Sequence, residues 1–209
     1  MTTTTITTTT TKTLMGFDTI EINLVFSILG VVPVDLLAII RLLAKNGQFS
    51  LTQYNEALNK LKFPSSESSD KPCPVPLSLS KKFTKLRGKA ISNWVHVRNF
   101  PLIVRGFVKN KNDPVLSLGL QLHDLVERLT ANEFFPHEID LINEKVKDYF
   151  SLRKQIRDDF PNIMPNIKPK HHYLRNIHLM AKLAVGLLLS QQSGKKAIFP
   201  PIIDIFVSS

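Results

Sequence analysis

The feature that most constrains the fold is an apolar run, INLVFSILGVVPVDLLAIIRLL, which extends from residue 22 to residue 43. It is long enough to cross a bilayer, which takes about 20 residues. Pro33 and Asp35 oppose that interpretation, because an aspartate at the centre of a membrane helix costs on the order of 2.5–3.5 kcal/mol. A globular helix accommodates both residues if Pro33 opens it and Asp35 lies in its electropositive first turn. The run therefore predicts a buried helix that ends at Asn46 and Gly47.

Helical patterns continue along most of the chain. Ser50 and Gln53 have the spacing of a capping box, and Asp113 and Pro114 suit the N-cap and first position of another helix. Apolar spacing predicts further helices over 81–99, 136–160 and 173–192, the first of which ends before Pro101. The AIFPPIIDIFV stretch alone suggests a strand, and its two prolines argue against a central one. The sequence predicts a mainly α fold, an irregular bundle of about six or seven helices.

Composition divides the chain into five segments. Residues 1–17 form a Thr-rich tail, with Thr at ten of the first 13 positions, which we expect to be disordered because it has almost nothing to bury. The tail lacks the basic start and apolar core of a secretory signal. We expect a helical pair over 18–62, a Pro/Ser-rich linker or loop over 63–80, a helical domain over 81–192 and a C-terminal tail over 193–209.

The net charge of +10 is concentrated in one part of the chain. Residues 81–112 carry nine basic side chains and no acidic one, whereas residues 113–160 carry ten acidic and six basic side chains. A basic block attracts polyanions, so we expect DNA or RNA phosphates to bind the 81–111 segment without sequence preference. The alternative is that the block docks on an acidic protein surface or meets the acidic segment of its own fold. The residues predicted to bind nucleic acid are Lys81, Lys82, Lys85, Arg87, Lys89, Arg98 and Arg105, of which Lys82, Lys85 and Lys89 share one face of the expected helix.

Motifs for catalysis and metal binding are not found in the sequence. It contains no Gly-rich phosphate loop, GxSxG elbow, HExxH pair or CxxC motif. Cys73 is the sole cysteine, which excludes an intramolecular disulfide and a Cys-based zinc site and fits an intracellular location, nuclear or cytoplasmic. A membrane partner is not expected. The sequence therefore predicts no enzyme activity, no catalytic residue and no cofactor.

Three histidines in KPKHHYLRNIH raise the question of a metal site. On a helix, His171 and His172 point about 100° apart, and His178 lies roughly 10 Å along the axis from His171. They cannot converge on one ion from a single helix, so we expect them to open a helix or to form hydrogen bonds, and we expect no metal site. The adjacent His123 and Asp124 lie on a polar helix face, and we do not expect a catalytic dyad there.

Five stretches resemble a group of transposon-derived, DNA transposase-like animal proteins. They are GVVPVDLLAII, NGQFSLTQYNEALNKLKF, KLRGKAISNWVHVRNFPLIVRGFV, DPVLSLGLQLHDLVERLTA and DDFPNIMPNIKPKHHYL, and they cover roughly residues 30–175. KPKHHYL is the most specific of these. The resemblance implies that the chain corresponds to a helical insertion within an RNase H-like catalytic core, and not to the core itself.

The chain departs from that family at both flanks. The family has a His-Asp pair before GVVP, where this chain reads LVFSILG. After KPKHHYL the family continues through His-Tyr-Pro towards an acidic stretch, where this chain reads RNIHLMAKLAVGLLLSQQ. The resemblance therefore implies a non-catalytic, transposase-derived helical protein, in a truncated or remodelled gene copy, with weak sequence-independent nucleic-acid binding. The alternative is a helical protein–protein interaction module with no nucleic-acid role.

Overall fold

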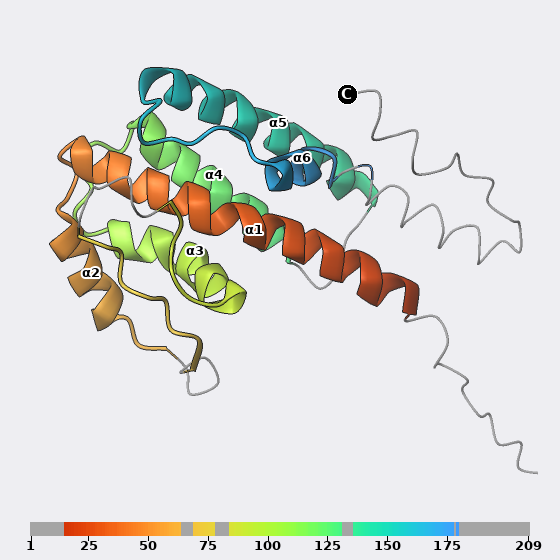
Figure 1. The fold of residues 1–209 in the computed structure, drawn as a ribbon, viewed down its shortest axis with the longest axis horizontal. Helices are drawn as coiled ribbons and strands as arrows, with labels where there is room; N and C mark the ends of the chain where they lie inside the picture. The colour runs from red at the N-terminus through yellow and green to blue at the C-terminus, as the bar shows by residue number, and fades with distance from the viewer. Residues whose placement is uncertain (1–14, 64–68, 78–83, 131–135, 178, 180–209) are drawn as a thin grey trace, which may run out of the picture.

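The structure, a computed structural model, describes residues 15–63, 69–77, 84–130, 136–177 and 179 (Figure 1). This part of the chain contains six helices and no strand, which confirms the mainly α fold. The helices are α1 (Met15–Lys45), α2 (Leu51–Lys60), α3 (Ala90–Val104), α4 (Pro114–Leu129), α5 (Pro136–Asp159) and α6 (Pro169–Arg175). Residues 1–14 of the Thr-rich tail, the C-terminal tail over 193–209 and most of the helix expected over 173–192 lie outside the described residues. The prediction that the tail extends to residue 17 is wrong, because residues 15–17 belong to α1.

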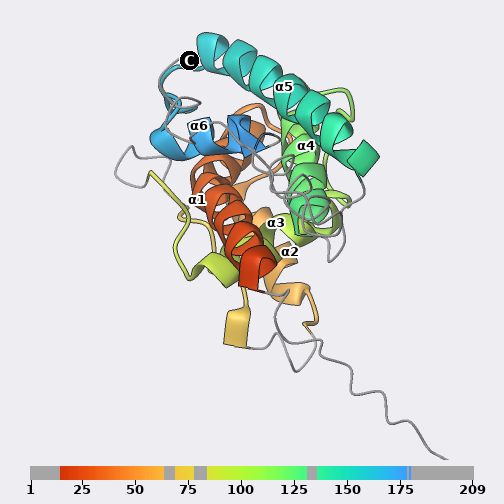
Figure 2. The same ribbon diagram turned by 90° about the vertical axis from the view of Figure 1, so that its right-hand side faces the viewer.

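Helix α1 is the centre of the bundle. It contacts α2, α3, α4 and α6, while α5 packs on α4 and α6. In Figure 2, α1 points towards the viewer, with α6, α4 and α3 arranged around it. One hydrophobic cluster includes side chains from all six helices, so the helical pair of 18–62 and the helices after residue 84 share a core.

The start of α1 differs from the prediction. The helix begins at Met15, and Pro33 lies inside it. Asp35 is completely buried and does not lie in a first turn. From Val31 to Leu43, neighbouring helices bury nearly every side chain, and this burial outweighs the cost of about 3 kcal/mol that an interior proline carries. The predicted burial is confirmed from Val31 to Leu43, and within the described residues no helix is long and apolar enough to span a bilayer.

The start of α2 follows the local sequence. Gly47 closes α1 with a φ of 71°, a conformation that favours glycine. The Ser50 hydroxyl accepts a hydrogen bond from the Gln53 N–H at 3.1 Å, and the Gln53 side chain accepts one from the Ser50 N–H at 2.8 Å. The rings of Phe49 and Tyr54 stack with centroids 5.5 Å apart. The predicted capping box is therefore confirmed, and these two rings pack as a hydrophobic staple.

The predicted helix over 81–99 is wrong at both ends. Residues 84–89 are not helical, and α3 begins at Ala90 and continues through Pro101 to Val104. Gly88 has a φ of 104°, which breaks the helix, and the Leu86 N–H donates to the Pro33 carbonyl at 2.8 Å. The shared helical face expected for Lys85 and Lys89 does not exist, because both lie in or at the end of this extended segment.

Residues 69–77, which belong to the region predicted as a linker, are attached to the helical bundle. The side-chain amide of Asn55 donates to the Val75 carbonyl and accepts from the Val75 N–H, both at 2.8 Å. Val75 itself is buried in the core. Residues 69–77 therefore lie against α2, since this two-point contact satisfies both backbone polar groups of a buried residue.

Helices α1, α3 and α4 approach one another at a glycine. A Cβ added to Gly119 of α4 would lie 2.6 Å from Phe100 Cε1 of α3 and 3.2 Å from Ile39 Cγ2 of α1. The first distance is shorter than any normal carbon–carbon contact. Only a residue without a side chain fits here, and this sets the spacing of the three helices.

Candidate functional site

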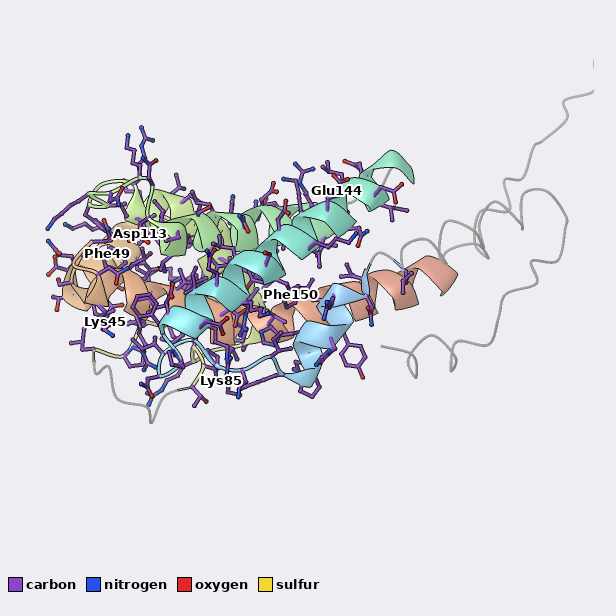
Figure 3. All side chains as sticks on the ribbon, turned by 90° about the horizontal axis from the view of Figure 1, so that it is seen from above. Lys45, Phe49, Lys85, Asp113, Glu144 and Phe150 are labelled. Atoms are coloured by element: carbon purple, nitrogen blue, oxygen red, sulfur yellow. The ribbon has the colours of Figure 1, made fainter. Side chains whose placement is uncertain are left out.

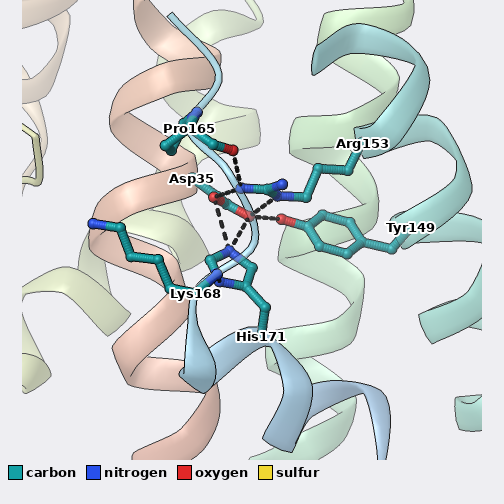
Figure 4. A network of polar contacts seen from close by, with 6 residues as sticks. All are labelled: Asp35, Tyr149, Arg153, Pro165, Lys168 and His171. Atoms are coloured by element: carbon teal, nitrogen blue, oxygen red, sulfur yellow. Dashed lines mark hydrogen bonds and ion pairs between the residues drawn. The ribbon is translucent and has the colours of Figure 1, made fainter. Parts of the chain in front are cut away.

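A buried polar network joins three helices near the middle of α1. Asp35 of α1 faces Tyr149 and Arg153 of α5 and His171 of α6 (Figure 4). All four side chains are buried, with exposed fractions of at most 1%. Buried charge is rare unless it is paired, so this cluster is the most unusual polar feature of the described core.

The carboxylate of Asp35 accepts hydrogen bonds from all three partners. Tyr149 Oη donates to Oδ2 at 2.6 Å, and Arg153 donates from Nε at 2.7 Å and from Nη2 at 2.9 Å to the two oxygens separately. The arginine contact is thus bidentate, which is the strongest geometry for such a pair. Arg153 Nη2 also donates to the Pro165 carbonyl at 3.0 Å, which attaches the α5–α6 connection to the same site.

The hydrogen bonds of His171 determine its tautomer. The Lys168 N–H donates to Nδ1 at 3.1 Å, so Nδ1 carries no proton. The proton of the neutral ring is therefore on Nε2, which lies 3.1 Å and 3.2 Å from the two Asp35 oxygens and donates to them. His171 thus connects the start of α6 to the centre of α1, and the hydrogen-bonding role expected for it is confirmed.

Charges in the network are balanced. Burial alone would raise the pKa of Asp35, but the hydrogen bonds from His171 and Arg153 and the arginine charge outweigh it and lower this pKa to about 2. Burial, together with the Asp35 charge, raises the pKa of the Tyr149 hydroxyl well above its usual value. Burial also opposes the charged form of Arg153, but the Asp35 carboxylate more than compensates and raises the arginine pKa. Within the site the Asp35 carboxylate thus pairs with the Arg153 guanidinium, and the Tyr149 hydroxyl and the His171 ring donate to the same carboxylate.

This geometry indicates a structural role. The carboxylate has no exposed face, and its hydrogen-bonding capacity is used by protein donors. Within the described residues there is no group of three or more His, Cys, Asp or Glu side chains that could hold a metal ion. The network fixes the positions of α1, α5 and α6 relative to one another, because only one arrangement satisfies all of its donors.

Two other buried polar contacts connect elements that are distant in the sequence. Tyr54 Oη and His96 Nε2 lie 2.9 Å apart, and burial lowers the pKa of His96 to about 4. Gln48 donates to the Asp113 carboxylate at 3.0 Å and accepts from the N–H groups of Lys109 and Asn110 at 3.0 Å each. The first contact connects α2 to the middle of α3, and the second connects the α1–α2 turn to the loop between α3 and α4. Both have the same structural character as the Asp35 network.

The His123–Asp124 pair does not form a dyad. His123 Nδ1 contacts the Val97 carbonyl at 3.2 Å, while Asp124 pairs with Lys145 at 2.7 Å and Arg128 at 3.1 Å. Burial alone would raise the pKa of Asp124, but these two cations outweigh it and lower the pKa. Both side chains thus connect α4 with α3 and α5.

The residues predicted to bind nucleic acid divide into two exposed groups. Lys85, Arg87 and Lys89 are exposed in the segment before α3, and Arg105 is exposed at the end of α3. The axis of α3 separates Lys89 from Arg105 by about 24 Å, at 1.5 Å per residue. Lys109 and Lys111 are exposed in the following loop, near Arg105 in the sequence, and Lys81 and Lys82 lie outside the described residues.

Arg98 differs from the other predicted residues. Its Nε lies 3.0 Å from Glu127 Oε1, and its guanidinium lies 4.5 Å from the ring centroid of Trp94. Arg98 therefore meets the acidic segment of its own fold, as one of the alternatives predicted. Among the residues that the structure describes, the cations without an ion pair include Lys85, Lys89, Arg105, Lys109 and Lys111.

Sequence reasoning missed the Asp35 network and two lysines on α6. A single acidic residue inside an apolar helix was the available signal, since a buried carboxylate requires a cationic partner. Its partners lie 114, 118 and 136 residues away, so no local pattern identifies them. Lys168 and Lys170 lie in the KPKHHYL motif, about 80 residues after the basic block, so charge density along the sequence does not group them with it.

The fold and the site define this chain as an α-helical bundle with a charged, fully hydrogen-bonded network in its core. Comparisons with protein-family models, with curated proteins and with solved structures find no match. The resemblance to transposon-derived proteins therefore stays a prediction.

Proposed function

We propose that this chain is a non-catalytic, transposase-derived helical protein that binds nucleic-acid phosphates weakly and without sequence preference. The observation that supports this most is the exposed segment 84–89, with its cations Lys85, Arg87 and Lys89. Lys85 and Lys89 form no ion pair with any other described residue, so binding a phosphate breaks no internal contact.

The segment that carries these cations has a fixed backbone. Leu86, between Lys85 and Arg87, is buried and donates its N–H to the Pro33 carbonyl at 2.8 Å. A fixed backbone lowers the entropy lost on binding, because only the side chains must be ordered. Three cations close together in the sequence release several counterions when they bind DNA, which predicts strongly salt-dependent affinity.

The second exposed group extends the contact. Arg105 lies at the far end of α3, about 24 Å from Lys89, and Lys109 and Lys111 follow it in the next loop. At 3.4 Å per phosphate, this distance covers about seven phosphates of one DNA strand. Two groups of cations at this spacing suit contacts with the phosphates along a DNA strand. Such contacts do not depend on the base sequence.

The absence of catalysis is part of the proposal. Asp35, His171, His96 and Asp124 are all engaged in structural contacts. Such engagement leaves none of them poised as a free acid, base or metal ligand in a solvent-accessible site. It is consistent with the two flanks at which the sequence departs from the transposase-like proteins that it resembles.

A second candidate is a protein–protein interaction module. Ile91, Arg98, Leu102 and Arg105 recur at helical spacing along the outside of α3, and Ile91 and Leu102 are 40% and 58% exposed. A face that mixes apolar and basic side chains fits an acidic partner with apolar residues of its own. Binding to phosphates needs no apolar contact, so the exposed apolar residues of this face favour a protein partner over nucleic acid.

Fluorescence anisotropy with a labelled DNA duplex distinguishes the two. We expect the full chain to bind with a Kd on the order of 10⁻⁴–10⁻⁶ M at physiological salt, and more tightly at about 50 mM salt. Lys85→Glu/Lys89→Glu should weaken binding at least about tenfold. The matched control, Lys147→Glu/Lys154→Glu on α5, makes the same change in net charge at exposed positions and should weaken it much less. No binding of the unmodified chain at low salt would reject the proposed function.

A further inference from the structure

Two more lysines lie beside the segment 84–89. Lys168 is the N-cap residue of α6, Lys170 lies in its first turn, and both are exposed. The Lys170 side chain crosses α1 at Gly30, where an added Cβ would overlap it. Neither lysine forms an ion pair with another residue in the described part of the chain.

The segment 84–89 and α6 meet neighbouring turns of α1. The Leu86 N–H bonds to Pro33, and Lys170 lies over Gly30. Gly30 and Pro33 are three residues apart, so they lie on one face of α1, about 4.5 Å apart along the axis. Figures 2 and 3 both place the segment and α6 on the same side of α1, and Figure 3 labels Lys85 there. Cations that are about 80 residues apart in the sequence are therefore neighbours in the fold.

The buried network fixes the backbone that carries these lysines. Lys168 donates its N–H to His171, which in turn donates to Asp35. Figure 4 shows the Lys168 side chain directed away from the network and across α1, on the side away from α5. The start of α6 is thus anchored from inside while its ammonium groups face outwards.

We propose that Lys168 and Lys170 complete, with Lys85, Arg87 and Lys89, one continuous cationic surface that binds the phosphate backbone of duplex DNA. This inference rests on the proposed function and specifies its site, which we name the α1–α6 surface. Neither 84–89 nor 168–170 contains an aromatic residue, while Tyr173, further along α6, is 54% exposed. Sites for single strands combine cations with aromatic side chains on which bases stack, so these two segments suit a duplex, whose bases are already stacked.

The salt dependence of duplex binding tests this surface. Each lysine that contacts a phosphate contributes about one to the slope of log K against log [salt]. We expect Lys168→Glu/Lys170→Glu to reduce that slope by about two and to weaken binding at least about tenfold near 100 mM salt. The control Lys147→Glu/Lys154→Glu should leave the slope unchanged. Lys168→Gln/Lys170→Gln keeps most of each side-chain stem over α1 and should also reduce the slope, which separates lost charge from lost packing.

The outcomes distinguish this inference from the proposed function. If Lys168→Glu/Lys170→Glu binds like the control while Lys85→Glu/Lys89→Glu loses affinity, the α6 part of the surface is overturned and the proposed function stands. If the unmodified chain binds a single strand more tightly than a duplex, the assignment to duplex DNA is overturned. If it binds poly-glutamate but no duplex at low salt, the inference and the proposed function both fail in favour of an acidic protein partner.

Discussion

Replacing Asp35 with alanine should destabilise the fold more than any exposed substitution. Removal of the carboxylate leaves the Arg153 guanidinium, which is 1% exposed, with only the Pro165 carbonyl as an acceptor. Tyr149 and His171 lose the same acceptor. Breaking one partner of a buried ion pair costs about 3–5 kcal/mol, because the other charge stays in a low-dielectric interior.

A cost of this size is a large part of the total stability. Domains are typically stable by about 5–15 kcal/mol, so Asp35→Ala removes roughly a third or more of a mid-range value. With a urea m-value of about 2 kcal/mol/M, a loss of 4 kcal/mol moves the unfolding midpoint down by about 2 M. Asp124→Ala is the matched control, because Asp124 is 37% exposed and its two ion pairs are worth about 1 kcal/mol or less.

Urea unfolding followed by circular dichroism at neutral pH measures both variants. Asp35→Ala should lose at least about 3 kcal/mol of unfolding free energy with an unchanged m-value. Asp35→Leu/Arg153→Met should recover much of that loss, because it leaves no buried charge at this site. A loss below about 1 kcal/mol for Asp35→Ala, or a double variant no more stable than the single one, would refute the assignment of a buried, mutually dependent pair.

Three further predictions follow from the packing and the pKa values. Gly119→Ala should cost about 1–3 kcal/mol in urea unfolding because its Cβ meets Phe100, whereas Gly106→Ala, with no atom within 4 Å, should be close to neutral; equal effects would contradict the close contact. His96 has a folded pKa of about 4 against 6.5 unfolded, so stability should fall by on the order of 3 kcal/mol as pH drops through that interval, and His96→Leu should flatten this dependence; an unchanged slope would exclude a buried neutral His96. Ser50→Ala should cost about 0.5–2 kcal/mol through the lost cap, and no measurable loss would contradict it.

Features determined by neighbouring residues could be predicted from the sequence. The capping box of Ser50 and Gln53 and the N-cap Asp113, which accepts from the Val115 N–H at 2.8 Å, are present as expected. Their geometry depends on three or four consecutive residues, so no tertiary information is needed. Pro114 likewise lies at the start of α4, where the sequence predicts it.

Helix ends that depend on tertiary packing could not be predicted in this way. Pro33 and Pro101 both lie inside helices, although proline normally marks a boundary. Burial of the surrounding residues in the shared core offsets the local cost at each position. Gly88 and the bond from Leu86 to Pro33 exclude residues 84–89 from the helix expected over 81–99, and that bond joins residues more than 50 positions apart.

The candidate site, like the fold, could be predicted from the sequence only in part. Composition located the basic block, whose exposed members include Lys85 and Lys89, because charge density is a property of the sequence alone. The proximity of Lys168 and Lys170 to that block depends on how α6 is anchored by His171 and Asp35, a contact across 136 residues. Only the folded chain brings these groups together.

The measurement that tests the proposed function most directly is a salt titration of the full chain with two unrelated DNA duplexes of equal length. The same Kd and the same slope of log K against log [salt] are expected for both duplexes. Each neutralised phosphate should contribute about −0.9 to that slope, and several phosphates should be neutralised. A slope near zero, a strong preference for one sequence, or no binding at about 50 mM salt would contradict a backbone-binding helical protein.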